Sequence, residues 1–235
     1  MTIGDLRQKQ ALPLEAKIIA SKQRIKEWYE YWNGDVYISN SGGVDSTVLS
    51  HLVHSLYPDV PDVYCDTGLE YPELRNFIMS KPNVVVLKPS LYNRHTRQYE
   101  NISFPQVISK YGYPLISKEQ SAFIQEYNTT SSDKLKQIRL NGNKYGRGKI
   151  SKRWQKFIDP NCDICVGDKC CDIMKKKPIH EYCKRTGRKT INGTMATESK
   201  QRELGWIKTG CNVFSIGREV SHPMSFWTEQ DVLLY

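Results

Sequence analysis

The residues best suited to chemistry form one short segment, Ser41-Gly42-Gly43-Val44-Asp45-Ser46, between an apolar run and a helical pattern. Paired glycines let the backbone take positive φ and approach a ligand closely. The helix that follows offers unpaired N–H groups and a positive dipole end, which suit a phosphate. The hydroxyl groups of Ser41 and Ser46 can add donors. Asp45 can orient the loop or hold a metal ion that bridges phosphates.

Other phosphate-binding signatures are missing from the chain. It has neither the Gly-x4-Gly-Lys-Ser/Thr loop nor the Gly-x-Gly-x-x-Gly fingerprint, so kinase-like and dinucleotide-binding proteins are disfavoured. A glycine-rich turn without a ligand is the alternative. The position of the segment after a strand favours a ligand, because parallel sheets bind ligands at the carboxyl ends of their strands.

A second polar group, Asp66-Thr67-Gly68, also follows an apolar run. A carboxylate, a hydroxyl and a glycine at a strand end can hold a ribose or a metal-bound water, although a simple Asx-type turn would look the same. Because both segments follow strands, we expect them to face one crevice.

A third group contains Thr194, Glu198, Ser199 and Arg202. Arg202 can clamp a phosphate or a sulfate through paired N–H donors. The alternative is a capped helix that carries a surface ion pair.

The seven cysteines are clustered rather than spread as a disulfide framework would be, which favours metal, cluster or redox chemistry. No second Cys-x2-Cys or histidine pair completes a zinc finger. The five cysteines that could bind a metal or an iron–sulfur cluster are Cys162, Cys165, Cys170, Cys171 and Cys211. Inert or redox-active thiols are the alternative.

Segments across the chain resemble the phosphoadenosine phosphosulfate (PAPS) reductase family, within the PP-loop superfamily of N-type ATP pyrophosphatases. Residues 41–46 resemble the PP-loop, and residues 63–73 resemble the second signature of the family. Residues 192–202 and 223–227 resemble later blocks. Val44 departs from the pattern, because many members carry lysine or glycine there. The sequence stops in mid-pattern of a helix, and a C-terminal tail with further cysteines normally follows in the family, so truncation is expected.

The resemblance implies an enzyme of sulfur metabolism that binds an adenine nucleotide. As a sulfonucleotide reductase it would take adenylyl sulfate or PAPS, with a thiol donor protein as partner and the attacking cysteine in the C-terminal tail. As an ATP pyrophosphatase it would take ATP with Mg²⁺ and activate a target for sulfur transfer. A catalytically inactive module that binds nucleotide or nucleic acid is the remaining alternative.

The resemblance also assigns roles to residues. The catalytic residues expected are Asp45, Ser46 and Arg202. The nucleotide-binding residues expected are Ser39, Ser41, Gly42, Gly43, Asp45, Ser46, Asp66, Thr67, Gly68, Thr194 and Glu198. In cluster-bearing relatives an adjacent Cys-Cys pair and a downstream Cys-x2-Cys ligate a [4Fe–4S] centre. Cys170-Cys171 matches the first half, and Cys211, or Cys162 with Cys165, would have to replace the second.

The net charge of +9 is concentrated in one segment. Residues 134–156 contain nine lysines and arginines and no acid, while the rest of the chain is balanced. Such segregated charge attracts polyanions, and Tyr145 and Trp154 could stack on bases, so nucleic acid is a candidate partner. A solvated loop is the alternative. No apolar run is long enough to cross a membrane and no secretory signal is evident, so we expect a cytoplasmic protein.

The elements that position these residues follow from periodicity. Strands are predicted at Val36–Ser39, Asp62–Asp66 and Val84–Leu87, alternating with helices, and the last strand is expected to be fully buried. This alternation predicts a doubly wound, mostly parallel α/β sheet flanked by helices. We expect a single domain over residues 1–235, with a nucleotide-binding core at 14–90, a basic insertion at 91–160, and a Cys-rich segment that completes the pocket at 161–235.

Overall fold

The computed structural model describes residues 1–235, which divide into two compact units. The first unit contains Met1–Asp66, Glu70–Leu87 and Glu181–Tyr235, and the second contains Thr67–Leu69 and Lys88–His180. The predicted three-part division stays a prediction.

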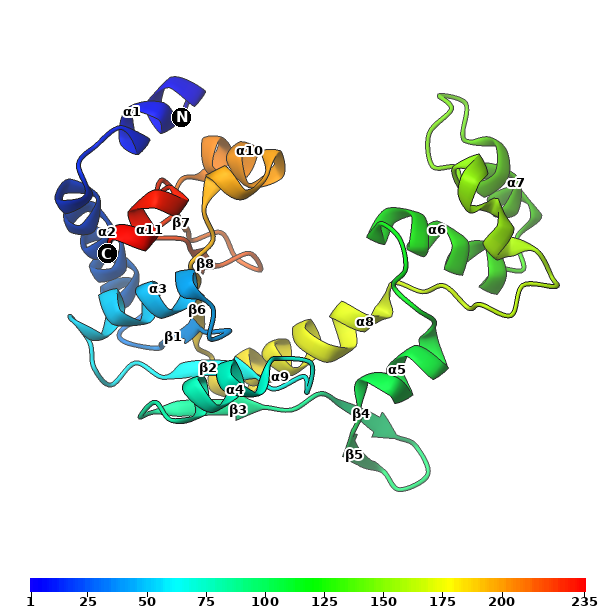
Figure 1. Ribbon diagram of the computed structural model, residues 1–235, viewed down its shortest axis with the longest axis horizontal. Coiled ribbons are helices and arrows are strands. Elements are labelled where there is room, and N and C mark those ends of the chain that lie inside the picture. The colour runs from blue at the N-terminus through cyan, green and yellow to red at the C-terminus, as the bar shows by residue number, and fades with distance from the viewer. The chain divides into compact units, whose positions relative to one another are not determined.

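A six-stranded sheet forms the centre of the first unit (Figure 1). Its order is β3-β2-β1-β6-β8-β7, and all neighbours are parallel except β7 and β8. The strands are β1 (Val36–Ser39), β2 (Asp62–Cys65), β3 (Val84–Leu87), β6 (Lys189–Ile191), β7 (Asn212–Val213) and β8 (Val220–Ser221). The predicted α/β fold class is confirmed.

Helices accompany this sheet along the chain. They are α1 (Ile3–Gln10), α2 (Leu14–Tyr31), α3 (Val44–His54), α4 (Pro72–Met79), η3 (Ala196–Glu198), α10 (Lys200–Thr209), α11 (Glu229–Leu234) and α9 (Lys177–Thr186), within which the chain passes from one unit to the other. Successive β1 side chains point to opposite faces of the sheet. Val36 and Ile38 therefore join the core with Leu49 of α3, while Tyr37 packs edge-on against Tyr182 of α9.

One predicted detail is wrong. Val84–Leu87 is a strand, but β3 lies at the edge of the sheet rather than inside it, and its side chains are half-buried or exposed. An edge strand has a neighbour on one side only, so a continuous apolar run does not guarantee full burial. The sequence analysis also did not predict the β-hairpin at residues 90–101, because its two strands are polar and short.

The second unit has no large sheet. It contains the antiparallel hairpin β4 (Ser90–Asn93) and β5 (Gln98–Asn101), followed by helical segments. These are α5 (Phe104–Tyr111), α6 (Lys118–Thr129), α7 (Asp133–Asn141), η1 (Lys152–Ile158), α8 (Lys169–Cys171) and the π-helical η2 (Asp172–Lys176). A small core around Ile124, Ile150, Phe157 and Val166 holds α6 and η1 together. No helix in the described chain is long and apolar enough to cross a membrane.

The strand order reverses beside β1. The chain runs outward from β1 through β2 to β3, and then returns to place β6 on the opposite side of β1. In open parallel sheets, ligands bind at the carboxyl ends of the strands at such a switch point. The topology therefore directs attention to the segments that follow β1 and β6.

Candidate functional site

The glycine-rich segment after β1 turns sharply into α3. Gly42 has φ +79°, a conformation that is costly for residues with a side chain, and an added Cβ would lie 2.7 Å from Cδ2 of Leu74. Gly43 is the residue before the first turn of α3, with an ordinary φ of −69°. The first amides of α3 have no acceptor within the helix and carry its positive dipole end. The loop therefore has the backbone that an anion requires.

The two serines mostly hold the loop in shape. The Ser46 hydroxyl donates to the Gly43 carbonyl oxygen at 2.9 Å, and it lies 3.3 Å from both the Ser41 amide nitrogen and the Ser41 hydroxyl. Ser46 is buried, whereas Ser41 is exposed. Ser46 thus closes the loop onto the helix, and the Ser41 hydroxyl is the more accessible donor.

A buried polar network lies under the loop, and the sequence analysis missed it. The Asn40 side chain accepts from the Gly42 amide at 2.8 Å and donates to the Asp62 carboxylate at 3.0 Å. Ser50 of α3 donates to the other Asp62 oxygen at 2.9 Å. Asp62 is fully buried, so these hydrogen bonds satisfy a carboxylate that would otherwise be costly. The available signal was an acid at the start of an apolar strand.

The segment after β6 forms the opposite wall. Gly193 packs against the start of α3, and an added Cβ would lie 3.0 Å from the Asp45 carbonyl oxygen. Beyond it, Arg202 of α10 forms an ion pair with Glu198, whose carboxylate also accepts from the Met195 amide at 2.6 Å. The sequence analysis gave a surface ion pair as the alternative role of Arg202. That ion pair is present, and it lies on the wall of the cavity described below.

His222 contacts two polar side chains of this wall, those of Thr194 and Asn192. His222 Nδ1 lies 2.7 Å from the Thr194 hydroxyl and also contacts the Asn192 side chain. Burial, with Arg202 nearby, lowers the pKa of His222 to about 4, so the ring is neutral at physiological pH. The sequence analysis nominated none of the five histidines, because none forms a spaced pair.

These walls enclose a cavity of about 280 Å³. It is lined by Ser39, Ser41, Gly43, Asp45, Ser46, Asn192, Gly193, Thr194, Glu198 and Arg202. A neighbouring cavity of about 210 Å³ shares Thr194 and Arg202 and reaches Trp206 and His222. Two of the three predicted groups are thus brought together, from segments about 150 positions apart in the chain.

The cavity contains one acid whose ionisation is disfavoured. Burial raises the pKa of Asp45, and the negative charge of Glu229 adds to this effect, while Arg202 opposes it. A site meant for an anionic ligand gains from an acid that carries less negative charge.

The second predicted group does not line this cavity. Asp66 is buried, and its two carboxylate oxygens accept from Arg75 of α4 at 3.0 and 2.8 Å in a bidentate pair. Thr67 and Gly68 belong to the second unit, so the cavity of the first unit is built without them. This cavity lies between the ends of β1 and β6, and the expectation that both segments face one crevice stays a prediction.

The cysteines do not gather into a metal site. All seven are free thiols, and no three His, Cys, Asp or Glu side chains of the described chain are placed to hold a metal ion. Within the second unit, burial and then the adjacent Cys171 raise the pKa of the Cys170 thiol, which disfavours the thiolate that a cluster needs. Within the second unit, Cys162, Cys165, Cys170 and Cys171 are not arranged to fit a [4Fe–4S] centre, and Cys211 belongs to the first unit.

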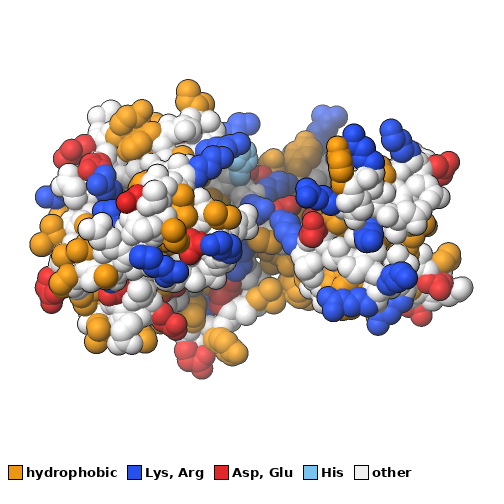
Figure 2. Space-filling model, turned by 90° about the horizontal axis from the view of Figure 1, so that it is seen from above, with side chains coloured by type: hydrophobic (Ala, Val, Ile, Leu, Met, Phe, Trp, Pro, Cys, Tyr) orange, Lys and Arg blue, Asp and Glu red, His pale blue; other side chains and the backbone are white.

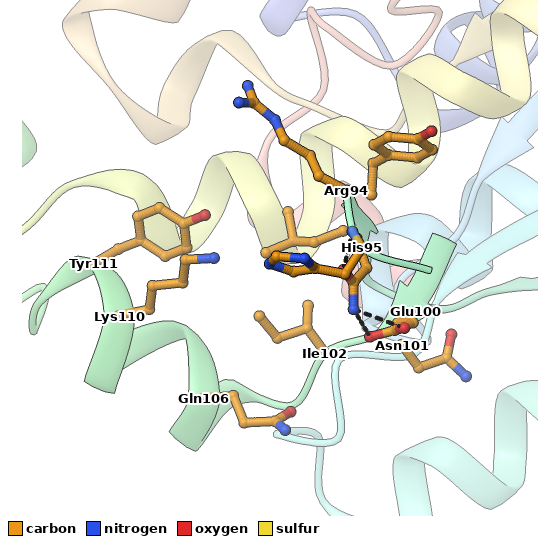
Figure 3. A pocket seen from close by; sticks show the side chains of 11 residues that line it. Arg94, His95, Glu100, Asn101, Ile102, Gln106, Lys110 and Tyr111 are labelled. Atoms are coloured by element: carbon orange, nitrogen blue, oxygen red, sulfur yellow. Dashed lines mark hydrogen bonds between the residues drawn. The ribbon is translucent and has the colours of Figure 1, made fainter. Parts of the chain in front are cut away.

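Another cavity lies in the second unit, away from the predicted residues. It has a volume of about 620 Å³ and lies between the β4–β5 hairpin and α5 (Figure 3). His95 and Lys110 extend into it, and Glu100 is held by the Asn93 amide at 2.9 Å. None of the residues predicted for nucleotide or metal binding lines this cavity, so its size alone does not make it the functional site.

Comparison with known protein families finds a match in the segment that contains the glycine-rich loop. A family model described as a phosphoadenosine phosphosulfate reductase domain matches residues 35–111. This segment is therefore similar to the phosphoadenosine phosphosulfate reductase family. The segment contains β1, the glycine-rich loop and β2, whereas residues 192–202 lie outside it, so their family roles stay predictions.

Individual relatives give the same family. Phosphoadenosine 5′-phosphosulfate reductase from Klebsiella pneumoniae (strain 342) is 30% identical over 104 residues, covering 39% of this chain and 43% of the relative. The enzyme of that name from Photorhabdus laumondii is 35% identical over 65 residues, covering 28% and 27%. The matches therefore span less than half of these relatives. A solved structure of phosphoadenylyl-sulfate (PAPS) reductase from Candida auris, in a phosphate complex, aligns with 91% of this chain and 77% of its own chain. The TM-score is 0.47 and the sequence identity is 12%, so this likeness carries no argument.

Proposed function

We propose that the cavity between β1 and β6 binds an adenine nucleotide by its phosphate groups, and that the protein is a sulfonucleotide reductase. The observation that carries the proposal is the convergence of the α3 amino terminus with Arg202 on one cavity. The names of the relatives that match the loop segment support the reductase over the ATP pyrophosphatase. The substrate class would be adenylyl sulfate or PAPS.

The proposed reaction places negative charge where the loop can stabilise it. A thiolate attacks the sulfur of the sulfonate group, the bond from sulfur to the phosphate oxygen breaks, and the nucleotide leaves with the electron pair. A second thiol then releases sulfite and forms a disulfide, so the thiol donor is oxidised. Amides at the start of α3 and the Arg202 guanidinium would stabilise the charge on the departing phosphate. Ser46 would hold the loop, and Asp45 would orient the substrate beside Arg202.

No cysteine of this chain is assigned as the attacking thiol. The thiol protein that donates the electrons is a separate partner. Mg²⁺ is expected only if ATP is the substrate, since Mg²⁺ commonly binds through one or two carboxylates together with phosphates. Asp45 fits such a single ligand. No step of the reductase reaction depends on it.

Calorimetry with adenylyl sulfate, PAPS, adenosine 3′,5′-bisphosphate and ATP tests the binding proposal. Ser46→Ala should weaken binding of the preferred nucleotide by about tenfold, because it loosens the loop by an amount typical of one lost hydrogen bond. Ser55→Ala is the matched control, because Ser55 ends the same helix and donates to the Leu52 carbonyl oxygen outside the cavity. Equal losses in the two variants would contradict the proposed site.

Turnover assays separate the remaining alternatives. Sulfite release from PAPS or adenylyl sulfate with a dithiol supports the reductase, whereas pyrophosphate release from ATP with Mg²⁺ supports the pyrophosphatase instead. Binding without either product identifies an inactive module. Arg202→Gln should lower turnover, and Arg24→Gln should not, although Arg24 also forms a helical ion pair, with Glu27.

A further inference from the structure

The second unit carries a strongly basic surface, which the proposed nucleotide site does not use. Its nine basic residues lie between Lys134 and Lys156, on α7, the following loop and η1. Arg139 is the only one of the nine in an ion pair, with Glu126. Lys and Arg side chains are spread over the part of the second unit that carries α6 and α7, at the right of Figure 2. Unpaired positive charge at this density creates a local potential that attracts polyanions.

The loop after α7 forms a defined turn rather than a loose insertion. The Asn143 side-chain oxygen accepts from the Tyr145 amide at 2.9 Å and from the Arg147 amide at 3.1 Å. The Asn143 amide donates to the Arg147 carbonyl oxygen at 2.8 Å, and Gly146 closes the turn with φ +70°. Such an Asx-based turn fixes its own backbone. It presents Lys144, Tyr145 and Arg147 to solvent, with the Tyr145 side chain 71% exposed.

Arg139 anchors this turn to the core of the unit. Its guanidinium donates to the Gly148 carbonyl oxygen at 2.6 Å and lies 4.2 Å from the centre of the Phe123 ring. The Ile150 amide donates to the Arg139 carbonyl oxygen at 2.7 Å, and the Ile150 side chain is buried. Arg139 therefore has a structural role, and the other cations of the surface are held on a preorganised support.

Cations and aromatic rings alternate on this surface. The Lys144 ammonium lies 4.9 Å from the centre of the exposed Tyr145 ring. The Arg153 guanidinium lies 4.7 Å from the centre of the Trp154 ring, which is half-buried against the core of the unit. Exposed rings beside cations are what single-stranded nucleic acids require, because unpaired bases stack on the rings while phosphates contact the cations. The bases of a duplex are stacked on one another and cannot reach an exposed tyrosine ring.

We propose that the turn at residues 143–147, with Lys149, Lys152 and Arg153 that follow it in the chain, binds single-stranded nucleic acid. Tyr145 stacks on a base, and the flanking cations contact phosphates. The site is independent of the proposed nucleotide cavity, since it is built wholly within the second unit.

Fluorescence anisotropy of the full chain with a labelled oligothymidine of about 20 nucleotides, across a range of NaCl concentrations, tests this proposal. Tyr145→Ala should weaken binding about tenfold, while Tyr145→Phe, which keeps the ring, should retain it. Lys144→Ser with Arg147→Ser should reduce the slope of log affinity against log salt by about 1.4, or 0.7 for each lost phosphate contact. The matched control is Lys26→Ser with Lys208→Ser, which removes two exposed charges from the first unit and should leave the slope unchanged.

Several outcomes would overturn the proposal. They are equal affinity for a duplex of the same length, an unchanged affinity in Tyr145→Ala, or binding to anionic lipid vesicles with no response to the oligonucleotide. An excess of adenosine 3′,5′-bisphosphate should not displace the oligonucleotide. Displacement would place the oligonucleotide in the nucleotide cavity and so reject this surface while leaving the proposed function intact. Thermal melting of each variant verifies that it is folded.

Discussion

Asp45 combines a position at the helix amino terminus with partial burial. Burial raises its pKa, with a smaller contribution from Glu229. A carboxyl group whose pKa is raised by folding contributes stability that is fully present below its unfolded pKa, near 3.8, and that is lost as the pH rises through the folded pKa. The charged group therefore costs stability at neutral pH.

Asp45→Asn should consequently raise the melting temperature at pH 7 and give no gain below about pH 3.8. Circular dichroism melts across this range measure the difference. Asp35→Asn, outside the cavity, serves as the control. A gain in Asp45→Asn that does not depend on pH would show that ionisation is not its cause.

His222 should make the fold sensitive to mild acid. Burial lowers the pKa of His222 from the usual value near 6.5 to about 4. Between pH 6.5 and pH 4, the unfolded chain therefore binds a proton on this ring and the folded chain does not. The free energy of unfolding should fall over this range by up to roughly 3 kcal/mol from this group. His222→Gln should flatten the decline of melting temperature from pH 6.5 to 4, while His95→Gln, at an exposed histidine, should not. Identical pH curves for His222→Gln and the natural chain would refute the assignment.

At the scale of elements, the turn from β1 into α3 depends on two adjacent glycines with different demands. Gly42 has positive φ and lies close to Leu74. Gly43 has an ordinary φ, and an added Cβ would lie 3.4 Å from the Ser41 hydroxyl, which is an ordinary van der Waals contact. Left-handed backbone costs a residue with a side chain about 1–2 kcal/mol, and the contact with Leu74 adds to that.

Gly42→Ala should therefore destabilise the protein by at least about 1–2 kcal/mol more than Gly43→Ala. Urea unfolding followed by tryptophan fluorescence measures both. Equal stabilities would show that the loop relaxes, and that its backbone is not held by the contacts around it.

For the whole molecule, a buried ion pair joins residues near the two ends of the chain. Lys17 of α2 donates to Asp231 of α11 at 2.6 Å, and the two residues are only 2% and 8% exposed. Asp231 also accepts from Thr228 at the start of α11. Removing one partner leaves the other as an uncompensated buried charge.

Lys17→Met should lower the free energy of unfolding by about 3–5 kcal/mol. Adding Asp231→Asn, which removes the stranded charge but keeps an acceptor for Thr228, should recover part of the loss. Urea unfolding of the two single variants and the double variant forms a thermodynamic cycle. Simple additivity would mean that the pair does not couple α2 to α11.

Much of the local structure was readable from the sequence. The apolar run Val36–Ser39, the glycines after it and the helical spacing from Val48 predicted β1, its loop and α3, because strand and helix periodicity are local properties. The hairpin at residues 90–101 was missed, because its strands are short and polar and β5 is fully exposed.

The sequence by itself determined three features: the resemblance of the loop segment to a known family, the parallel α/β sheet, and the glycine-rich loop at residues 41–46 that suits an anion. Each of them depends on residues close together in the chain. Only the tertiary structure decided which distant residues meet that loop. The return of the chain to place β6 beside β1 brings Thr194 and Arg202 to the cavity, positions His222 behind them, and leaves Asp66 paired with Arg75. Strand order is set by the packing of whole helices against the sheet, which no short stretch of sequence encodes.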